Sequence, residues 1–326
     1  MFQFGERHMI NWSRRILAAV VASLIVFGSS ASGVSAKEKV FRVAFQKGGG
    51  NLIFLKERGI LERKLAPLGW TVTWTEFPAG PQLLEALNVG AADFGPVGEA
   101  PPIFAQAAGA DIIYAGYEPA SPRNEAIIVP KDSKIRTIAD LKGKRVALNK
   151  GSNVNYFLVR ALESNGLTYK DIEPAYLAPA DARAAFERGA IDAWVIWDPY
   201  YAAAEISLNA RLVADATGLA ANVAFYIATR KIAEENPKVL ESVLSAIDEI
   251  DGWIKVNQKQ YAAELSPKIG LPVDVIERSV GRAEFGARRV DAATLVEQQK
   301  IADTFTRLQL IPKSIVVKDA AWKAEF

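Results

Sequence analysis

Short apolar runs alternate with amphipathic stretches along most of the chain. Runs in which apolar residues alternate or follow one another predict β-strands, and apolar residues spaced three and four apart predict helices. By this rule the first part of the chain has strands at 40–46, 71–77 and 91–97, with helices at 53–66, 81–90 and 101–109. Strands that alternate with helices of this length are typical of βαβ units on a parallel sheet.

The same alternation is repeated after residue 124. Strands are expected at 125–130, 144–149, 173–178, 193–197 and 223–229, with helices at 137–143, 155–166, 180–189 and 199–206. The rest of the chain has helical periodicity, at 237–266, 272–280 and 291–308. The predicted fold class is therefore α/β, built twice, with a helical tail that we expect to pack on the first lobe.

This repetition predicts two lobes joined by a two-strand hinge. We expect lobe I to comprise residues 37–125 and 230–326, and lobe II residues 126–229. The chain is expected to cross near 126–129 and to return near 226–229. Hinge closure around a ligand in the cleft is the motion that this architecture favours.

Residues 1–36 have the organisation of a secretory signal peptide. A basic flank ending in Arg14 and Arg15 precedes an apolar run at 16–27, and small residues close at Ala36. The apolar run is too short to span a bilayer, so we expect cleavage after Ala36. A plain basic flank is favoured over a twin-arginine signal, which stays an alternative. Since a lipid anchor needs a cysteine, we expect a periplasmic protein without a lipid anchor.

Composition narrows the chemistry of the mature chain. The whole chain has 39 basic and 37 acidic residues, and loss of Arg7, Arg14, Arg15 and Glu6 with the signal peptide leaves the two in balance. Nucleic acid is not expected as a partner, because there is no basic excess. There is no cysteine, and the single histidine, His8, lies in the signal peptide. The mature chain thus has no thiol nucleophile, imidazole base or Cys/His metal ligand, and no cofactor is expected.

Four predicted strands are each followed by a loop and a helix that begins at a proline or at a Ser-Asn pair. The loops carry Gly80, Gly98, Gly151-Ser152 and Asp198. The first turn of a helix has backbone N–H groups without an intrahelical acceptor, which suits an anion. Four such turns predict an oxyanion-binding cleft rather than one reactive centre.

Each polar candidate also has a simpler interpretation. Ser152 and Asn153 are common N-caps, and Glu99 is more readily a cap than a general base. Asp198, before a proline, favours capping over ligand contact, although a cleft carboxylate could bind an ammonium group. Of Trp194 and Trp197, which point to opposite faces of a strand, Trp197 is the one expected in the cleft, with core packing the alternative.

Two other candidates are Gln46 and the glycine run at 48–50. Gln46 ends the first strand and offers two donors and an acceptor to a ligand. The glycine run lacks the spacing of a nucleotide-binding loop. We therefore expect ligand contact from Gln46 and no nucleotide site.

Taken together, these segments resemble the periplasmic sulfonate-binding proteins of ABC importers, most closely the aliphatic sulfonate-binding type. The resemblance rests on EFPAGPQLLEALNVG, PPIFAQAAGAD, PADARAAFERGAIDAWVIWDPYYAA and QQKIADTF with LIPKSI, which span most of the mature chain. It implies a type II periplasmic binding protein fold, a sulfonate held between the lobes, and delivery to a membrane permease for sulfur acquisition. A monomer without enzymatic activity is expected.

The resemblance also implies the ligand contacts. The matching positions are Gln46, Gly80, Gly98, Glu99, Gly151, Ser152, Asn153, Asn155, Trp197 and Asp198. Two of them depart from the family pattern: Val97-Gly98-Glu99 stands where the family often has Thr-Gly-Asp, and Asn155 where many relatives have histidine.

Several functions stay open on this resemblance. An alkanesulfonate or taurine-like ligand is the leading expectation. Aromatic sulfonates, sulfate esters, nitrate or a pyrimidine precursor are alternatives on the same fold, and an enzyme acting on a sulfate ester is a less favoured one.

Overall fold

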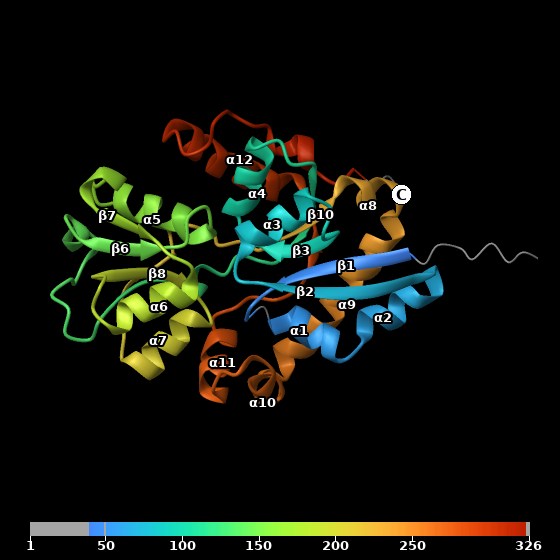
Figure 1. Ribbon diagram of the computed structural model, residues 1–326, viewed down its shortest axis with the longest axis horizontal. Helices are drawn as coiled ribbons and strands as arrows, with labels where there is room; N and C mark the ends of the chain where they lie inside the picture. The colour runs from blue at the N-terminus through green and yellow to red at the C-terminus, as the bar shows by residue number, and fades with distance from the viewer. Residues whose placement is uncertain (1–38, 49, 324–326) are drawn as a thin grey trace, which may run out of the picture. The chain divides into compact units, whose positions relative to one another are not determined.

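The computed structural model describes residues 39–48 and 50–323 (Figure 1). The predicted signal peptide and its cleavage site lie outside the described residues. Within them, two β-sheets each carry helices on both faces, as the alternation of strands and helices predicts. The sheets define a larger and a smaller lobe.

The larger sheet has six strands, and the third of them in the order below, β10, is antiparallel to both of its neighbours. Their order across the sheet is β11 (Arg288–Arg289), β4 (Ile112–Tyr117), β10 (Phe225–Thr229), β3 (Phe94–Val97), β1 (Lys39–Gln46) and β2 (Trp70–Phe77). β1 pairs in parallel with β2 and β3, whereas β10 is antiparallel to β3 and β4. The carboxyl ends of β1, β3 and β4 and the start of β10 therefore lie at one edge.

Two hydrophobic cores cover the faces of this sheet. Phe41, Val43 and Phe45 of β1 face one core, and Ala44 between them faces the other. The first core includes α1 (Gly50–Glu57), α2 (Ile60–Leu65) and α9 (Pro237–Val256). The second includes α3 (Gly80–Asn88), α4 (Ala100–Ala107) and α12 (Ala292–Arg307). The prediction that the helical tail packs on the first lobe is confirmed for α9 and α12.

The smaller sheet has five strands and the same layering. Their order is β7 (Glu173–Tyr176), β6 (Arg145–Leu148), β8 (Ala193–Trp197), β5 (Glu125–Val129) and β9 (Arg211–Asp215). The helices that cover it are α5 (Asn153–Glu163) on one face, and α6 (Pro179–Glu187) and α7 (Tyr200–Leu208) on the other. β6 and β8 are parallel, and β5 is antiparallel to β8.

Sheet membership moves both expected crossings toward the N-terminus. β5 lies wholly in the smaller sheet and β10 wholly in the larger one. The chain thus passes between the sheets at 118–124 and returns at 216–224, rather than at 126–129 and 226–229. The sequence did not reveal this because a short, fully buried strand such as β10 has the same pattern in either sheet.

Two long predicted helices are each interrupted. The expected helix at 53–66 is divided into α1 and α2 by Gly59, whose positive φ of 57° ends α1. The expected helix at 237–266 is divided into α9 and α10 (Gln258–Ile269) at Asn257. α10 is followed by α11 (Val273–Val280), which packs on α7 of the smaller lobe. The tail therefore contacts both lobes.

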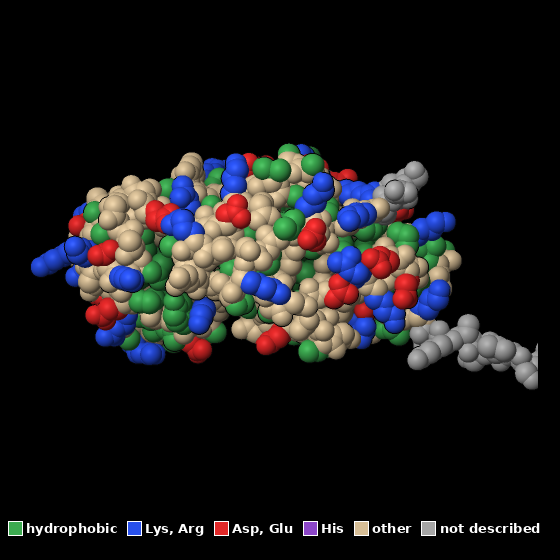
Figure 2. Space-filling view, turned by 90° about the horizontal axis from the view of Figure 1, so that it is seen from above, with side chains coloured by type: hydrophobic (Ala, Val, Ile, Leu, Met, Phe, Trp, Pro, Cys, Tyr) green, Lys and Arg blue, Asp and Glu red, His purple; other side chains and the backbone are tan. Residues whose placement is uncertain are grey.

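One face of the molecule is mixed in charge. Figure 2 shows acidic and basic side chains interspersed over the face that it presents. None of the helices in the described ranges has the length and apolarity that crossing a bilayer requires.

Candidate ligand-binding site

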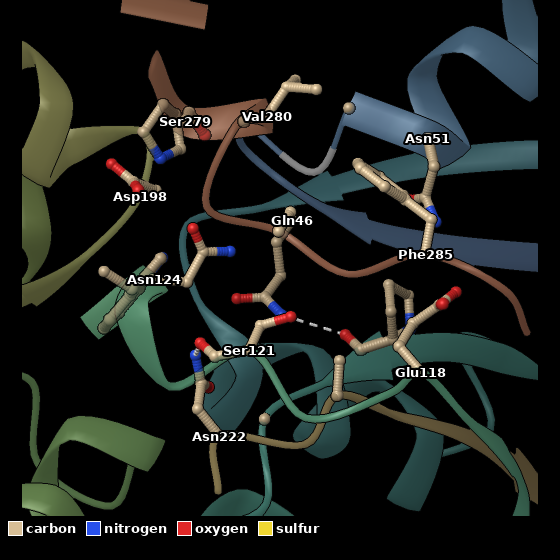
Figure 3. A pocket seen from close by; sticks show the side chains of 18 of the residues that line it. Gln46, Asn51, Glu118, Ser121, Asn124, Asp198, Asn222, Ser279, Val280 and Phe285 are labelled. Atoms are coloured by element: carbon tan, nitrogen blue, oxygen red, sulfur yellow. Dashed lines mark hydrogen bonds between the residues drawn. The ribbon is translucent and has the colours of Figure 1, made fainter. Parts of the chain in front are cut away.

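A cavity of about 240 Å³ lies between the two sheets, at their facing edges. Gln46 and Val97 reach it from the carboxyl ends of β1 and β3, and Trp197 reaches it from the carboxyl end of β8. The loops beyond these strand ends supply most of the polar lining, as is usual where ligands bind α/β sheets. Figure 3 shows polar side chains from both lobes around this space.

Helix N-termini converge on the cavity from both lobes. Residues at or just before the first turns of α3, α4, α5 and α7 line it: Gly80, Gly98, Pro101, Ser152, Asn153, Asp198 and Pro199. A helix N-terminus carries a partial positive charge and free N–H groups. The expected convergence of the four turns is therefore present in the fold, and it makes this part of the cavity suited to an anion.

The turn before α5 is held by its own side chains. Gly151 has a φ of 74°, which a side chain would strain, and its N–H donates to Asn155 Oδ1 at 3.0 Å. Asn155 also donates to the Tyr169 hydroxyl. The Ser152 hydroxyl donates to Asn149 O at 2.7 Å rather than accepting from the helix. Gly151 and Asn155 do not line the cavity, so Asn155 shapes the turn from behind.

Asn153 brings the two lobes into contact beside the cavity. Its Nδ2 donates to Glu125 and, at 3.1 Å, to Asn222 Oδ1. A Cβ added at Gly98 in the larger lobe would lie 2.7 Å from Cβ and Cγ of Asn153. Because its amide hydrogens are engaged in this way, Asn153 offers the cavity chiefly the helix N-terminus that it begins.

Glu99 does not line this cavity, although it is among the expected contacts. Glu99 is 1% exposed, and its side chain does not cap α4. Its Oε2 accepts a hydrogen bond from Val223 N at 3.1 Å. Burial raises the pKa of Glu99 to about 7. Burial and, less strongly, the charge of Glu99 raise the pKa of Glu125 well above its usual value. Glu99 therefore connects α4 to the returning segment at 216–224.

Asp198 lines the cavity but is already satisfied. Its Oδ1 accepts from Ala202 N of the first turn of α7 at 2.9 Å, although the N-cap residue itself is Pro199 and not Asp198 as the sequence favoured. Its carboxylate also lies 3.3 Å from Arg282 Nη1, which belongs to the segment after α11. Burial raises the pKa of Asp198 to about 6, an effect that Arg282 opposes. This ion pair joins the smaller lobe to the C-terminal segment.

Gln46 and Trp197 line the cavity, and their contact with a ligand stays a prediction. Gln46 Nε2 donates to Pro96 O at 3.0 Å, which fixes its amide against β3. Trp197 packs edge-on against Tyr200, with ring centroids 6.1 Å apart, and gives the cavity an aromatic wall. Trp194, by contrast, is 1% exposed in the core of the smaller lobe.

Sequence reasoning missed a group of polar residues on the larger lobe and the crossing segments. They are Asn51, Glu118, Ser121, Asn124, Asn222 and Tyr226. Glu118 directly follows β4, which was not predicted, although the apolar run at 112–115 was a signal for it. Tyr226 was overlooked because the direction of β10 puts its start, not its end, at the cavity.

No cluster of three or more His, Cys, Asp or Glu side chains suited to a metal ion occurs within the described ranges. The polar lining consists mainly of amide, hydroxyl and backbone groups, with carboxyl groups at separate positions. Such a lining can bind a small polar organic molecule.

The fold and the cavity define a two-lobed solute-binding protein with a type II periplasmic binding protein fold. The chain belongs to the NMT1/THI5-like family, whose model matches residues 72–260. An Escherichia coli (strain K12) relative named for aliphatic sulfonate binding is 41% identical over 311 residues, which cover 95% of this chain and 97% of that protein.

Solved structures give the same result. The alkanesulfonate-binding protein SsuA from Xanthomonas axonopodis pv. citri, bound to MOPS, has a TM-score of 0.85 and 41% identity, with 89% of this chain and all of that chain covered. The periplasmic aliphatic sulphonate-binding protein SsuA from Escherichia coli has a TM-score of 0.80 and 43% identity, with 87% and 98% covered. The recognition made from the sequence segments and the predicted fold class are thereby confirmed.

Proposed function

We propose that the protein is an extracytoplasmic solute-binding protein that captures an organosulfonate and delivers it to the membrane permease of an ABC importer. The convergence of four helix N-termini on one cavity is the observation that carries this proposal. Relatives that are at least 41% identical and are named for aliphatic sulfonate or alkanesulfonate binding support it.

The chemistry of a sulfonate fits such a cavity. A sulfonate is ionised at any physiological pH, so it needs hydrogen-bond donors and no proton acceptor. Backbone N–H groups at the starts of α4 and α5 supply donors from the two lobes, while Trp197 and Val97 supply surface for an organic tail. A ligand held from both sides would stabilise the closed arrangement of the lobes.

Binding without catalysis is part of the proposal. Asp198, an acid on the cavity wall, is engaged by Arg282 and by a helix N–H, which leaves it a poor general base. The competing function is hydrolysis of a sulfate ester on the same fold. Release of sulfate from an aryl or alkyl sulfate by the purified protein would favour that competitor.

The proposal also covers the cellular location of the protein and the movement of its two lobes. Cleavage after Ala36 would release a monomer into the periplasm, with lobes that move about the segments at 118–124 and 216–224. Sequencing the N-terminus of the protein recovered from a periplasmic extract tests the cleavage, and a mature chain that still begins at residue 1 would contradict it.

Ligand-induced thermal stabilisation tests the binding function. Ligand-stripped mature protein is heated with alkanesulfonates, an aromatic sulfonate, sulfate and nitrate in turn. At 100 times Kd, a ligand adds about 2.7 kcal/mol to the free energy of unfolding, which gives a clear shift in Tm. We expect the largest shift from an organic sulfonate, and no shift with any sulfur oxyanion would overturn the proposal.

Transport is tested separately in cells. A strain that lacks the gene is grown with an alkanesulfonate or with sulfate as its only sulfur source. We expect loss of growth on the alkanesulfonate alone. Unchanged growth on every sulfonate that the protein binds would mean that the protein binds sulfonates without feeding an importer.

A further inference from the structure

Two buried acids lie on opposite sides of the contact between the lobes. Glu99 precedes α4 of the larger lobe and is 1% exposed, and Glu125 begins β5 of the smaller lobe and is 0% exposed. Oε1 of Glu99 and Oε2 of Glu125 have no hydrogen-bond partner among the described residues. A buried carboxyl oxygen without a partner is costly when the group is ionised, so the pair calls for an explanation.

A network of hydrogen bonds connects the two acids. Glu99 Oε2 accepts from Val223 N at 3.1 Å, and the neighbouring Asn222 Oδ1 accepts from Asn153 Nδ2 at 3.1 Å. Asn153 Nδ2 also donates to Glu125 Oε1. The network therefore runs from the larger lobe, through the returning segment, to the smaller lobe. Because it spans both lobes, opening of the cleft would interrupt it and bring water to both carboxyl groups.

No basic side chain compensates the pair within 39–48 and 50–323. Neither acid takes part in an ion pair there. Glu99 also lines a second cavity, of about 690 Å³, beside the two crossing segments. The other titratable groups that line this second cavity come from β4, α5, β11 and α12, and they are Tyr117, Tyr156, Arg288, Glu297 and Lys300.

The charged groups of these neighbouring elements are engaged elsewhere or exposed. Lys300 is paired with Glu297 at 2.7 Å, and Arg288 is exposed to solvent. On the Glu125 side, Arg123 donates to Gly281 O, Asp198 is paired with Arg282, and Asp215 accepts from Thr217 N. Two adjacent buried carboxyl groups without a cation are stable together only when at least one of them is protonated.

Ionisation of Glu99 would also act on the bound sulfonate. Gly98, next to Glu99, lines the ligand cavity at the start of α4, where the proposed function places the sulfonate group. A negative charge on Glu99 would lie close to the negative charge of the ligand, and like charges repel strongly in a buried site. Closing of the lobes and the presence of a sulfonate therefore both favour a neutral Glu99.

We infer that sulfonate binding is coupled to proton uptake: closing of the lobes on the ligand places a proton on the Glu99–Glu125 pair, and loss of this proton favours opening and release. This inference rests on the proposed function and adds a proton-binding site to it. The raised pKa of Glu99, about 7, agrees with it. Since closing raises this pKa, affinity is highest at low pH and is lost as pH rises from about 5 through 7.

Calorimetric titration with butane-1-sulfonate tests the coupling, because this ligand keeps the same charge at every pH used. Kd of the ligand-stripped mature protein is expected to rise about threefold to tenfold between pH 6 and pH 8. At pH 7, titrations in bis-tris and in Tris, which differ in ionisation enthalpy and have no sulfonate group, should show uptake of about half a proton per ligand. In Glu99→Gln, Kd should change by less than about twofold, without proton uptake.

The control variant is Glu85→Gln, which changes an exposed glutamate of α3 and should keep the pH dependence of the wild-type protein. Where Glu99→Gln does not fold, Glu99→Met, of similar size, takes its place. A wild-type Kd that is equal at pH 6 and pH 8, without proton uptake, overturns the inference and leaves the proposed function intact. A pH dependence that persists without Glu99 assigns the proton to another group and also overturns the inference. Absence of binding at every pH overturns the proposed function itself.

Discussion

Gly98 of the larger lobe and Asn153 of the smaller lobe are in contact beside the ligand cavity, with no room for a side chain at residue 98. A Cβ there would lie 2.7 Å from the Asn153 side chain. Asn153 cannot withdraw easily, because its amide donates to Glu125 and to Asn222. The two lobes therefore approach each other at a glycine that the sequence analysis predicted as part of a turn and as a ligand contact.

Gly98→Ala is expected to weaken ligand binding. The added methyl group forces the helix starts of α4 and α5 apart, and overpacking of this kind costs about 1–3 kcal/mol. Kd should rise about fivefold to a hundredfold in a calorimetric titration. Gly252→Ala in α9 is the control, since its Cβ would meet nothing within 4 Å. Equal affinities of the two variants would contradict the account of this contact.

Arg282→Met is expected to destabilise the protein. The Asp198 side chain is 0% exposed and would lose the cation that compensates it. Removing one partner of a buried ion pair costs about 3–5 kcal/mol, and the 17% exposure of Arg282 places the expected loss near the lower limit. Urea unfolding at pH 7.5 measures it.

The control for this variant is Arg183→Met, which breaks a surface pair with Glu187 in α6 and should cost about 0.5 kcal/mol or less. Because burial raises the pKa of Asp198 to about 6, protonation at pH 5 should reduce the loss in Arg282→Met. An equal loss at both pH values would show that lost packing on Tyr201, not charge, is responsible.

Glu99 should make the stability of the protein depend on pH around neutrality. Burial raises its pKa in the folded protein to about 7, from 4.5. A raised pKa stabilises the folded state at low pH, and this contribution is lost as pH rises from about 5 through 7. Between pH 5 and pH 8, the free energy of unfolding of the wild-type protein should therefore fall by up to about 3 kcal/mol more than that of Glu99→Gln.

The measurement for Glu99 is Tm between pH 5 and pH 8 for the wild-type protein, Glu99→Gln and the surface control Glu85→Gln. Other buried acids contribute to the slope in all three proteins, so only the difference between slopes is informative. Identical slopes for Glu99→Gln and the wild-type protein would refute the assignment.

Asn155→Ala tests whether this residue acts on the fold or on the ligand. The variant leaves Gly151 N and the Tyr169 hydroxyl without their partner in a buried turn. An unsatisfied buried donor costs about 1–3 kcal/mol, so the free energy of unfolding should fall by about that amount. The order in which the ligands of the thermal stabilisation test raise Tm should not change. A changed order would indicate that Asn155 contacts the ligand.

The two-lobed α/β fold was predictable because the local spacing of apolar residues indicates most of its strands and helices. Strands such as β1 and helices such as α3 and α12 alternate apolar and polar positions over eight residues or more. The location of β10 was not predictable, because the sequence pattern of a short buried strand does not indicate which strands it pairs with or in which direction it runs. The crossings between lobes depend on that partner.

The candidate site was predictable to the extent that it follows strand ends. Gln46, Gly98, Ser152 and Trp197 line the cavity because each ends a strand or precedes a helix. Glu99 and Asn155 have similar positions in the sequence but face inward, since a side chain's direction within a turn depends on tertiary packing. Glu118 required β4 to be recognised first.

A crystal structure of the mature protein grown with butane-1-sulfonate tests the central claim most directly. We predict that the sulfonate group lies in the cavity, with its oxygen atoms about 3 Å from backbone N–H groups at the starts of α4 and α5 and its alkyl chain against Trp197 and Val97. A sulfonate group bound elsewhere, or a cavity that stays empty while the ligand binds in solution, would contradict the account.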